Sequence, residues 1–102
     1  MDVIERFIGF DWDAGNRGKS WTRHRVSDDE CEELFFNLPL VLVPDAAHSA
    51  HEARHYVLGK TNGGRRLFVA LTMRSGRVRV ISARDMTRKV RRAYDAAEKT
   101  DA

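Results

Sequence analysis

The fold is decided by residues 54–85, which read RHYVLGKTNGGRRLFVALTMRSGRVRVISARD. Runs of apolar and β-branched residues alternate there with turn-forming residues. The runs predict strands over residues 54–60, 66–73 and 77–83. Tight turns are expected at Asn62-Gly63-Gly64 and Ser75-Gly76, because asparagine and glycine tolerate the left-handed conformations of hairpin turns. This stretch therefore predicts three sequential antiparallel strands.

The last of these strands has the clearest pattern. Since side chains alternate between the two faces of a strand, we expect one face to carry Val78, Val80 and Ser82 and the other Arg77, Arg79 and Ile81. Two further strands are expected upstream. One is the apolar run Leu40–Val43, closed by Pro44, and the other is the shorter segment Phe7–Trp12.

A helix is predicted to begin after Ser27. Ser27 and Glu30 have the spacing of a capping box, and Val26 and Cys31 that of a hydrophobic staple. The apolar residues at helical spacing predict one buried stripe, made of Cys31, Leu34, Phe35 and Leu38.

Two more helices complete the predicted fold. Asp13 is the expected N-cap of a helix that runs to about Arg23, and Asp85 is that of a C-terminal helix. The apolar face of the C-terminal helix is predicted to consist of Met86, Val90, Ala93 and Ala97, with Tyr94 beside it. Residues 1–102 therefore predict a single α+β domain, with an antiparallel sheet packed against helices in the order β-α-α-β-β-β-β-α.

The composition fits a folded protein that is not in a membrane. Hydrophobic residues make up 42% of the 102 residues, and no apolar run is long enough to span a bilayer. The first six residues include acids and lack the apolar stretch of a signal peptide. The single cysteine, Cys31, fits a reducing compartment. We expect a soluble, cytoplasmic protein.

Charge is unevenly distributed along the chain. Residues 27–53 contain seven acids and no lysine or arginine, whereas residues 60–92 contain nine arginines, two lysines and one acid. Such a basic stretch is typical of proteins that bind polyanions, and arginine suits phosphate oxygens better than lysine does. The alternative is a solvated basic face, which charge runs often form.

Short motifs along nearly the whole chain resemble the BrnT family. In the first half they are Phe10-Asp11-Trp12-Asp13, Gly15-Asn16-Arg17-Gly18-Lys19, His24 with Val26-Ser27, Phe35-Phe36-Asn37 and Pro39-Leu40. In the second half they are Asp45 with His48-Ser49, Glu52 with Arg54, Gly59, and the run from Arg77 to Met86 ahead of Arg91 and Tyr94. The order and spacing of these fragments make the resemblance specific.

The resemblance implies a fold like that of RelE-type toxins and a cofactor-free, metal-independent endoribonuclease that slows growth by cutting RNA. It also implies a BrnA-like antitoxin, encoded beside the toxin and repressing the shared promoter. A higher-order complex in which the antitoxin binds DNA is among the implied assemblies. No membrane partner is implied.

The chain departs from the usual pattern of the family at three positions. Arg25 stands where glycine is common, Ser20 where asparagine is common, and Val90 where a glutamate of the last helix is usual. Val90 favours a second hypothesis, a non-catalytic basic module that binds nucleic acid or a partner, such as a decayed toxin. A third hypothesis is a metal-dependent hydrolase.

Metal-free cleavage of RNA needs a general base, a general acid and cations that hold the charge developing on phosphorus. Arg79 and Arg84 are the expected phosphate contacts, and the alternative for both is a structural ion pair. The proton-transfer candidates are His24 and His48, with Glu52 beside His48, and both histidines match the family pattern. The structural alternatives are a cation at a helix end for His24 and a turn residue paired with Asp45 or Glu52 for His48.

Other charged and aromatic residues are assigned more briefly. The residues expected to bind RNA without catalysing its cleavage are Lys19, Arg54, Arg77, Arg88 and Arg91, of which Arg77 lies near a turn and is also compatible with a solvated charge. His48, His51 and His55 are too loosely spaced for a zinc site, so no metal is expected. Trp12 is expected in the core, and Trp21 is a candidate for base stacking.

Overall fold

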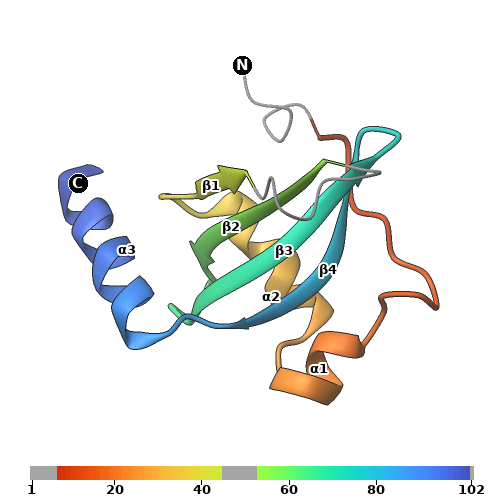
Figure 1. Cartoon of the computed structure of the whole chain (residues 1–102), viewed down its shortest axis with the longest axis horizontal. Helices are drawn as coiled ribbons and strands as arrows, with labels where there is room; N and C mark the ends of the chain where they lie inside the picture. Colours follow the sequence, from red (N-terminus) through yellow and green to blue (C-terminus); the bar gives the residue numbers. More distant parts are fainter. Residues whose placement is uncertain (1–6, 45–52, 102) are drawn as a thin grey trace.

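The computed structural model describes residues 7–44 and 53–101. Within them, a four-stranded antiparallel sheet has the strand order β1-β2-β3-β4. The strands are β1 (Val41–Pro44), β2 (Arg54–Lys60), β3 (Arg66–Arg74) and β4 (Arg77–Asp85). The helices are α1 (Lys19–His24), α2 (Asp28–Glu33), the 3₁₀ helix η2 (Leu34–Phe36) and α3 (Arg88–Asp101). Figure 1 shows α2 across one face of the sheet, with α3 at the left of the view and α1 at the bottom.

The β2–β4 meander confirms the predicted strands and turns. Lys60 pairs with Arg66 across the first turn and Arg74 with Arg77 across the second. In the second turn, Ser75 and Gly76 have φ angles of 51° and 76°. Two successive positive φ angles match the twist of antiparallel strands, which is why this two-residue connection forms a hairpin.

A β-bulge in β4 changes which side chains face the core. Ala70 pairs with Ser82 and Leu71 with Val80, so Ile81 is the extra residue. Val78 and Val80 are buried as predicted, but after the bulge Ala83 is buried and Ser82 is exposed. The predicted alternation was therefore wrong at Ser82, because an inserted residue reverses the faces of all that follow.

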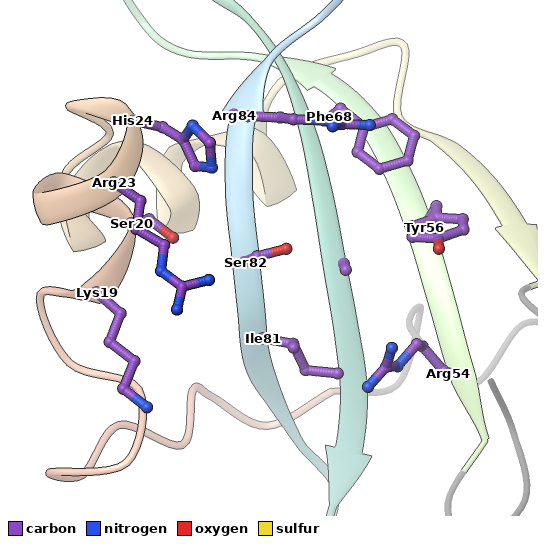
Figure 2. A pocket seen from close by; sticks show the side chains of 11 residues that line it. Lys19, Ser20, Arg23, His24, Arg54, Tyr56, Phe68, Ile81, Ser82 and Arg84 are labelled. Atoms are coloured by element: carbon purple, nitrogen blue, oxygen red, sulfur yellow. The ribbon is translucent and has the colours of Figure 1, made fainter.

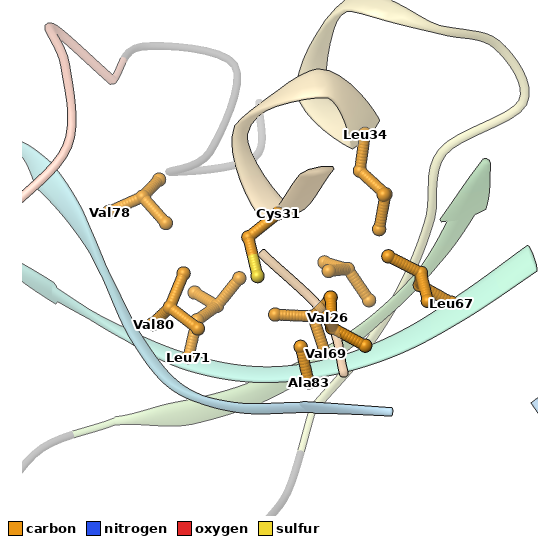
Figure 3. Close-up of a cluster of buried hydrophobic side chains, with 10 residues drawn as sticks. Val26, Cys31, Leu34, Leu67, Val69, Leu71, Val78, Val80 and Ala83 are labelled. Carbon is orange, nitrogen blue, oxygen red and sulfur yellow. The ribbon is translucent and has the colours of Figure 1, made fainter. Parts of the chain in front are cut away.

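The hydrophobic core lies between the sheet and α2 (Figure 3). Its members from the helical segment are Val26, Cys31 and Leu34, and those from the sheet are Val57, Leu67, Val69, Leu71, Val78, Val80 and Ala83. The other face of the sheet, which bears Tyr56, Phe68, Ser82 and Arg84, is called the open face below.

The predicted start of α2 is confirmed. The Glu30 amide donates to Ser27 Oγ and the Ser27 amide to Glu30 Oε1, each over 3.0 Å. Leu38, however, is 81% exposed rather than part of the buried stripe. The chain leaves α-helical geometry at Leu34 and enters η2, whose three residues per turn shift later side chains off the core face.

The structure also corrects the N-terminal elements. The segment at Phe7–Trp12 makes a single parallel bridge, Phe10 to Val78, instead of a strand. Trp12 packs against the core, and its indole donates to Glu32 over 2.7 Å. Asp13 does not cap a helix but accepts from the Gly15 amide in a turn, and α1 begins only at Lys19.

The described elements therefore follow the order α-α-β-β-β-β-α, without the first predicted strand. The α+β class and the antiparallel sheet are confirmed. The likeness to RelE-type toxins stays a prediction.

Helix α3 packs at the end of the sheet through a few specific contacts. Tyr94 is 1% exposed and donates to the Pro39 carbonyl over 2.6 Å, whereas Ala93 of the predicted apolar face is exposed. Burial raises the pKa of Tyr94. Ion pairs complete the attachment: Arg66 with Asp95 and Glu98, and Lys60 with Glu98. The helix starts three residues after Asp85, because Asp85 belongs to β4.

Candidate nucleic-acid interface

A pocket of about 410 Å³ lies between α1 and the open face of the sheet. Figure 2 shows its side chains converging from α1 on one side and from three strands on the other. Helix α1 contributes Lys19, Ser20, Arg23 and His24. The strands contribute Arg54 and Tyr56 from β2, Phe68 and Ala70 from β3, and Ile81, Ser82 and Arg84 from β4.

Helix α1 is held beside β4 by a hydrogen bond between a serine side chain and the strand backbone. The buried hydroxyl of Ser20 accepts from the Ala83 amide over 2.9 Å, one residue after the exposed Ser82. Gly18 precedes the helix with a φ of 72°, a conformation that suits glycine, and leaves Lys19 as the first helical residue. The helix thereby presents Lys19 and Arg23, four residues apart, toward the strands (Figure 2).

The end of α1 is fixed by Arg65. Its guanidinium donates to the carbonyl oxygens of Arg25 over 2.7 Å and His24 over 3.3 Å. The same guanidinium pairs with Asp85 over 2.7 Å and with Glu30 over 3.2 Å. These bonds raise the pKa of Arg65 and lower that of Asp85. Arg65 therefore joins α1, α2 and β4 behind the pocket wall.

Arg25 closes α1 in a left-handed conformation, with a φ of 57°. Glycine adopts this conformation without strain, which gives a physical reason for the glycine that the BrnT resemblance leads one to expect here. The guanidinium of Arg25 lies 5.6 Å from the ring centre of Trp21, which is 49% exposed. Trp21 is therefore accessible but does not line the pocket.

The pocket is lined by several cations, and none of the described residues that line it carries a carboxylate. Within residues 7–44 and 53–101, Lys19, Arg23 and Arg84 form no ion pair. Outside the pocket, ion pairs with aspartate or glutamate are formed by Lys60, Arg65, Arg66, Arg79 and Arg91. Convergent cations without counter-charges favour the binding of an anion.

An aromatic pair and an arginine form a row across the open face. The ring centroids of Tyr56 and Phe68 are 4.7 Å apart at an interplanar angle of 38°. The guanidinium carbon of Arg84 lies 4.9 Å from the centroid of Phe68. The bulge in β4 is what brings Arg84 to this face, since regular alternation would have placed it with Val78 and Val80.

Four of the predicted site residues meet at the pocket: Lys19, His24, Arg54 and Arg84. Four others lie elsewhere. Arg77 is exposed at the start of β4, and Arg88 and Arg91 are exposed on α3, where Arg91 is 3.7 Å from Asp95. Their predicted roles in RNA binding stay predictions.

Arg79 is the fourth, and it is held by acids. It contacts Asp13 over 2.9 Å and Asp11 over 3.4 Å, and its side chain is only 12% exposed. The hydrogen bond from Arg79 lowers the pKa of Asp13. The contacts indicate a structural role in joining the N-terminal turn to β4, and a role on RNA stays a prediction.

The remaining candidates come from residues 45–55. His48 and Glu52 lie outside the described residues, as do Asp45 and His51 of the alternatives. His55 lies on β2, and its Nδ1 is buried with no hydrogen-bond partner among the residues described. No group of three or more potential metal ligands comes together within the described residues.

Three residues that line the pocket were not predicted from the sequence: Arg23, Tyr56 and Phe68. Arg23 carried a signal, because it follows Lys19 at helical spacing. Tyr56 carried another, because it lies two residues after Arg54 and so on the same face of a strand. Phe68 offered no such signal, because its proximity to Tyr56 depends on how β2 and β3 pair.

No helix in the described part of the chain is long and apolar enough to cross a membrane. No curated protein matches the chain. One family profile matches residues 12–89, and its description is ribonuclease toxin, BrnT, of type II toxin–antitoxin system. Because this match covers most of the 102 residues, the chain belongs to the BrnT family of ribonuclease toxins.

Proposed function

We propose that the pocket between α1 and the open face is the cleavage site of a metal-independent endoribonuclease. The observation that carries this proposal is the convergence of Lys19, Arg23 and Arg84 beside His24. Family membership implies an RNA substrate and an antitoxin protein as partner. The charge of the pocket supports its assignment as the place where that RNA binds.

The proposed reaction uses the 2′-hydroxyl of the RNA as nucleophile. Its oxygen attacks the adjacent phosphorus while a base takes its proton, and the bond from phosphorus to the 5′-oxygen breaks. An acid protonates that 5′-oxygen, which leaves a 2′,3′-cyclic phosphate and a free 5′-hydroxyl. Cations stabilise the charge on the phosphate in the transition state, a role that arginine fills without a metal.

The residues have distinct roles in this scheme. Arg84, Lys19 and Arg23 bind the phosphate, and His24 supplies one of the two proton transfers, because an imidazole can accept a proton at one nitrogen and donate one from the other. His48 and Glu52, which precede Arg54 in the sequence, are the predicted sources of the other transfer. Which group is the base and which the acid is decided by pH–rate profiles of the single variants.

The test is digestion of total RNA by purified protein in excess EDTA, with product ends identified. We expect cleavage that EDTA does not inhibit, cyclic phosphate ends, and a large loss of activity in His24→Gln. The exposed Thr22→Ala, on the same helix but outside the pocket, is the matched control. Intact RNA with folded wild-type protein, or activity that EDTA abolishes and magnesium restores, would contradict the proposal.

A non-catalytic basic module is the second candidate function. Val90, the position where the family usually has glutamate, is half-buried on α3 and lies just beyond the matched residues 12–89. If that glutamate serves catalysis in relatives, this chain binds RNA without cutting it. Val90→Glu distinguishes the two functions: a gain of cleavage in the variant, with none in wild type, favours the binding module.

We also propose that the partner is a BrnA-like antitoxin whose acidic residues cover the pocket. The support is the group of cations Lys19, Arg23 and Arg84 in the pocket lining, whose positive charge a partner with acidic residues would complement. Co-expression with the adjacent gene product is expected to give a complex that RNA displaces and whose association slows as salt rises. Simultaneous binding of RNA and antitoxin contradicts this masking.

The antitoxin is also the proposed DNA-binding part of the complex. Retardation of promoter DNA by the complex, but not by the toxin alone, tests whether the DNA is bound through the antitoxin.

A further inference from the structure

The open face carries a recess that its charge alone does not explain. Tyr56, Ala70 and Ser82 lie opposite one another on β2, β3 and β4, and Leu58, Phe68 and Arg84 form the neighbouring row. Ala70 and Ser82 are small, so their row leaves space next to Tyr56 and beside the larger side chains of Phe68 and Arg84 in the neighbouring row. Of these six residues, all but Leu58 line the pocket.

We propose that this recess is a base-stacking subsite that restricts the ribonuclease to unpaired RNA. The proposal rests on the proposed function, since it concerns RNA held in the same pocket. Tyr56 and Phe68 are half-buried, so their rings are fixed by the sheet yet reachable from the pocket. Their centroid separation of 4.7 Å shows that the rings already pack on each other.

Arg84 completes the subsite because it lies over Phe68 at 4.9 Å. A guanidinium is planar, so one face can lie on an aromatic ring while the other receives a base. Its N–H groups point outward from the edge of that plane and suit phosphate oxygens. Ser82 is exposed beside it and offers a hydroxyl to the edge of a base.

The arrangement of charge sets the direction of the RNA backbone. Lys19 and Arg23 belong to α1, on the opposite side of the pocket from Tyr56 (Figure 2). A nucleotide whose base lies on the aromatic side therefore has its phosphates toward α1 and Arg84. A base in a duplex is paired and stacked between its neighbours, so it cannot enter the recess, whereas an unpaired base can be splayed out onto the rings.

The test measures binding separately from cleavage. The probe is a short 2′-O-methyl RNA, which lacks the attacking hydroxyl, used as a single strand and annealed to its complement. We expect wild-type protein to bind the single strand about tenfold or more tightly than the duplex, the size of effect that one stacked base supplies. A single strand with abasic sites is expected to bind as weakly as the duplex.

Three variants locate the effect. Tyr56→Leu is expected to weaken single-strand binding about tenfold and leave duplex binding unchanged, while Tyr56→Phe keeps the ring and wild-type preference. Phe36→Leu, which removes an exposed ring on η2 outside the pocket, is the matched control. Thermal melts establish that each variant is folded.

The outcomes distinguish failure of the stacking subsite from failure of the proposed ribonuclease function. Equal binding of single strand, duplex and abasic strand overturns the stacking subsite, while cleavage of total RNA in EDTA leaves the proposed function standing. A preference for single strands that survives in folded Tyr56→Leu also overturns the subsite. Failure of wild-type protein to bind any of the probes, together with intact total RNA, overturns both.

Discussion

Replacing Arg84 with glutamine removes one of the four permanent positive charges that line the pocket, the others being Lys19, Arg23 and Arg54. Glutamine keeps a polar side chain of similar reach but cannot neutralise a phosphate. Within the described residues Arg84 forms no ion pair, so the substitution leaves no acid stranded. Its loss from the ring of Phe68 costs about 0.5–1 kcal/mol for an exposed cation–π contact, which is too little to unfold the domain.

The expected effect on RNA binding follows from the number of charges. Each phosphate contact to a single strand contributes about −0.7 to the slope of log K against log salt. If Lys19, Arg23 and Arg84 each contact one phosphate, the slope is about −2.1 in wild type and about −1.4 in the variant. A charge-assisted hydrogen bond contributes about 1.5–3 kcal/mol, so affinity at low salt falls about tenfold or more.

The assay is fluorescence anisotropy with a 2′-O-methyl single strand, titrated at several salt concentrations. Arg77→Gln is the control, because it makes the same charge change on the same strand but outside the pocket. We expect Arg77→Gln to keep a slope closer to that of wild type. Circular dichroism and a thermal melt accompany both variants.

Two results would refute the reasoning. An unchanged slope and affinity in folded Arg84→Gln would mean that the pocket does not hold phosphate. A larger loss in Arg77→Gln than in Arg84→Gln would move the RNA to the beginning of β4 and away from the pocket.

Gly59→Ala is expected to lower the free energy of unfolding by about 1–3 kcal/mol, because the new Cβ would lie 2.9 Å from Leu34 Cγ. Denaturant melts measure the change, with Gly63→Ala as the control because its new Cβ meets no atom closer than 3.9 Å. Arg79→Ala is expected to lower the melting temperature since it frees Asp13, whereas lost cleavage at an unchanged melting temperature would support the sequence-based prediction of a role on RNA. Acid is expected to destabilise the fold. Ion pairs with arginine hold the pKa values of Asp13 and Asp85 below 3.8. The stability that these two carboxylates contribute is therefore complete above that pH and is lost as the pH falls through their lower pKa values in the folded protein. A melting temperature that is flat from pH 5 to 2 contradicts this.

Local patterns in the sequence were sufficient for much of the fold. The strands β2 and β3 and their turns follow from apolar runs and glycines, and the start of α2 follows from the Ser27–Glu30 capping box. These features depend on neighbours within a few residues, which a sequence displays directly. The order of short motifs also indicated the BrnT family, which the match over residues 12–89 confirms.

Errors arose where a local rule met a distant partner. Asp13 is a residue type that often caps helices, yet its carboxylate pairs with Arg79, 66 residues along the chain. Leu38 has the spacing of a core residue, but the tighter turn of η2 exposes it. In each case the local preference is worth about a kcal/mol, and a tertiary contact or a change in helix type outweighs it.

The sequence by itself determined which residue types were available for chemistry: an excess of arginine after residue 60, and a histidine and lysine near the start of the chain. Only the tertiary structure decided which of them meet. The pocket joins α1 to three strands, and the bulge at Ile81 turns Arg84 out of the core side and onto the rings of the open face. The physical reason is that one inserted residue reverses the faces of a strand, and its position is set by pairing with β3 rather than by any pattern within β4.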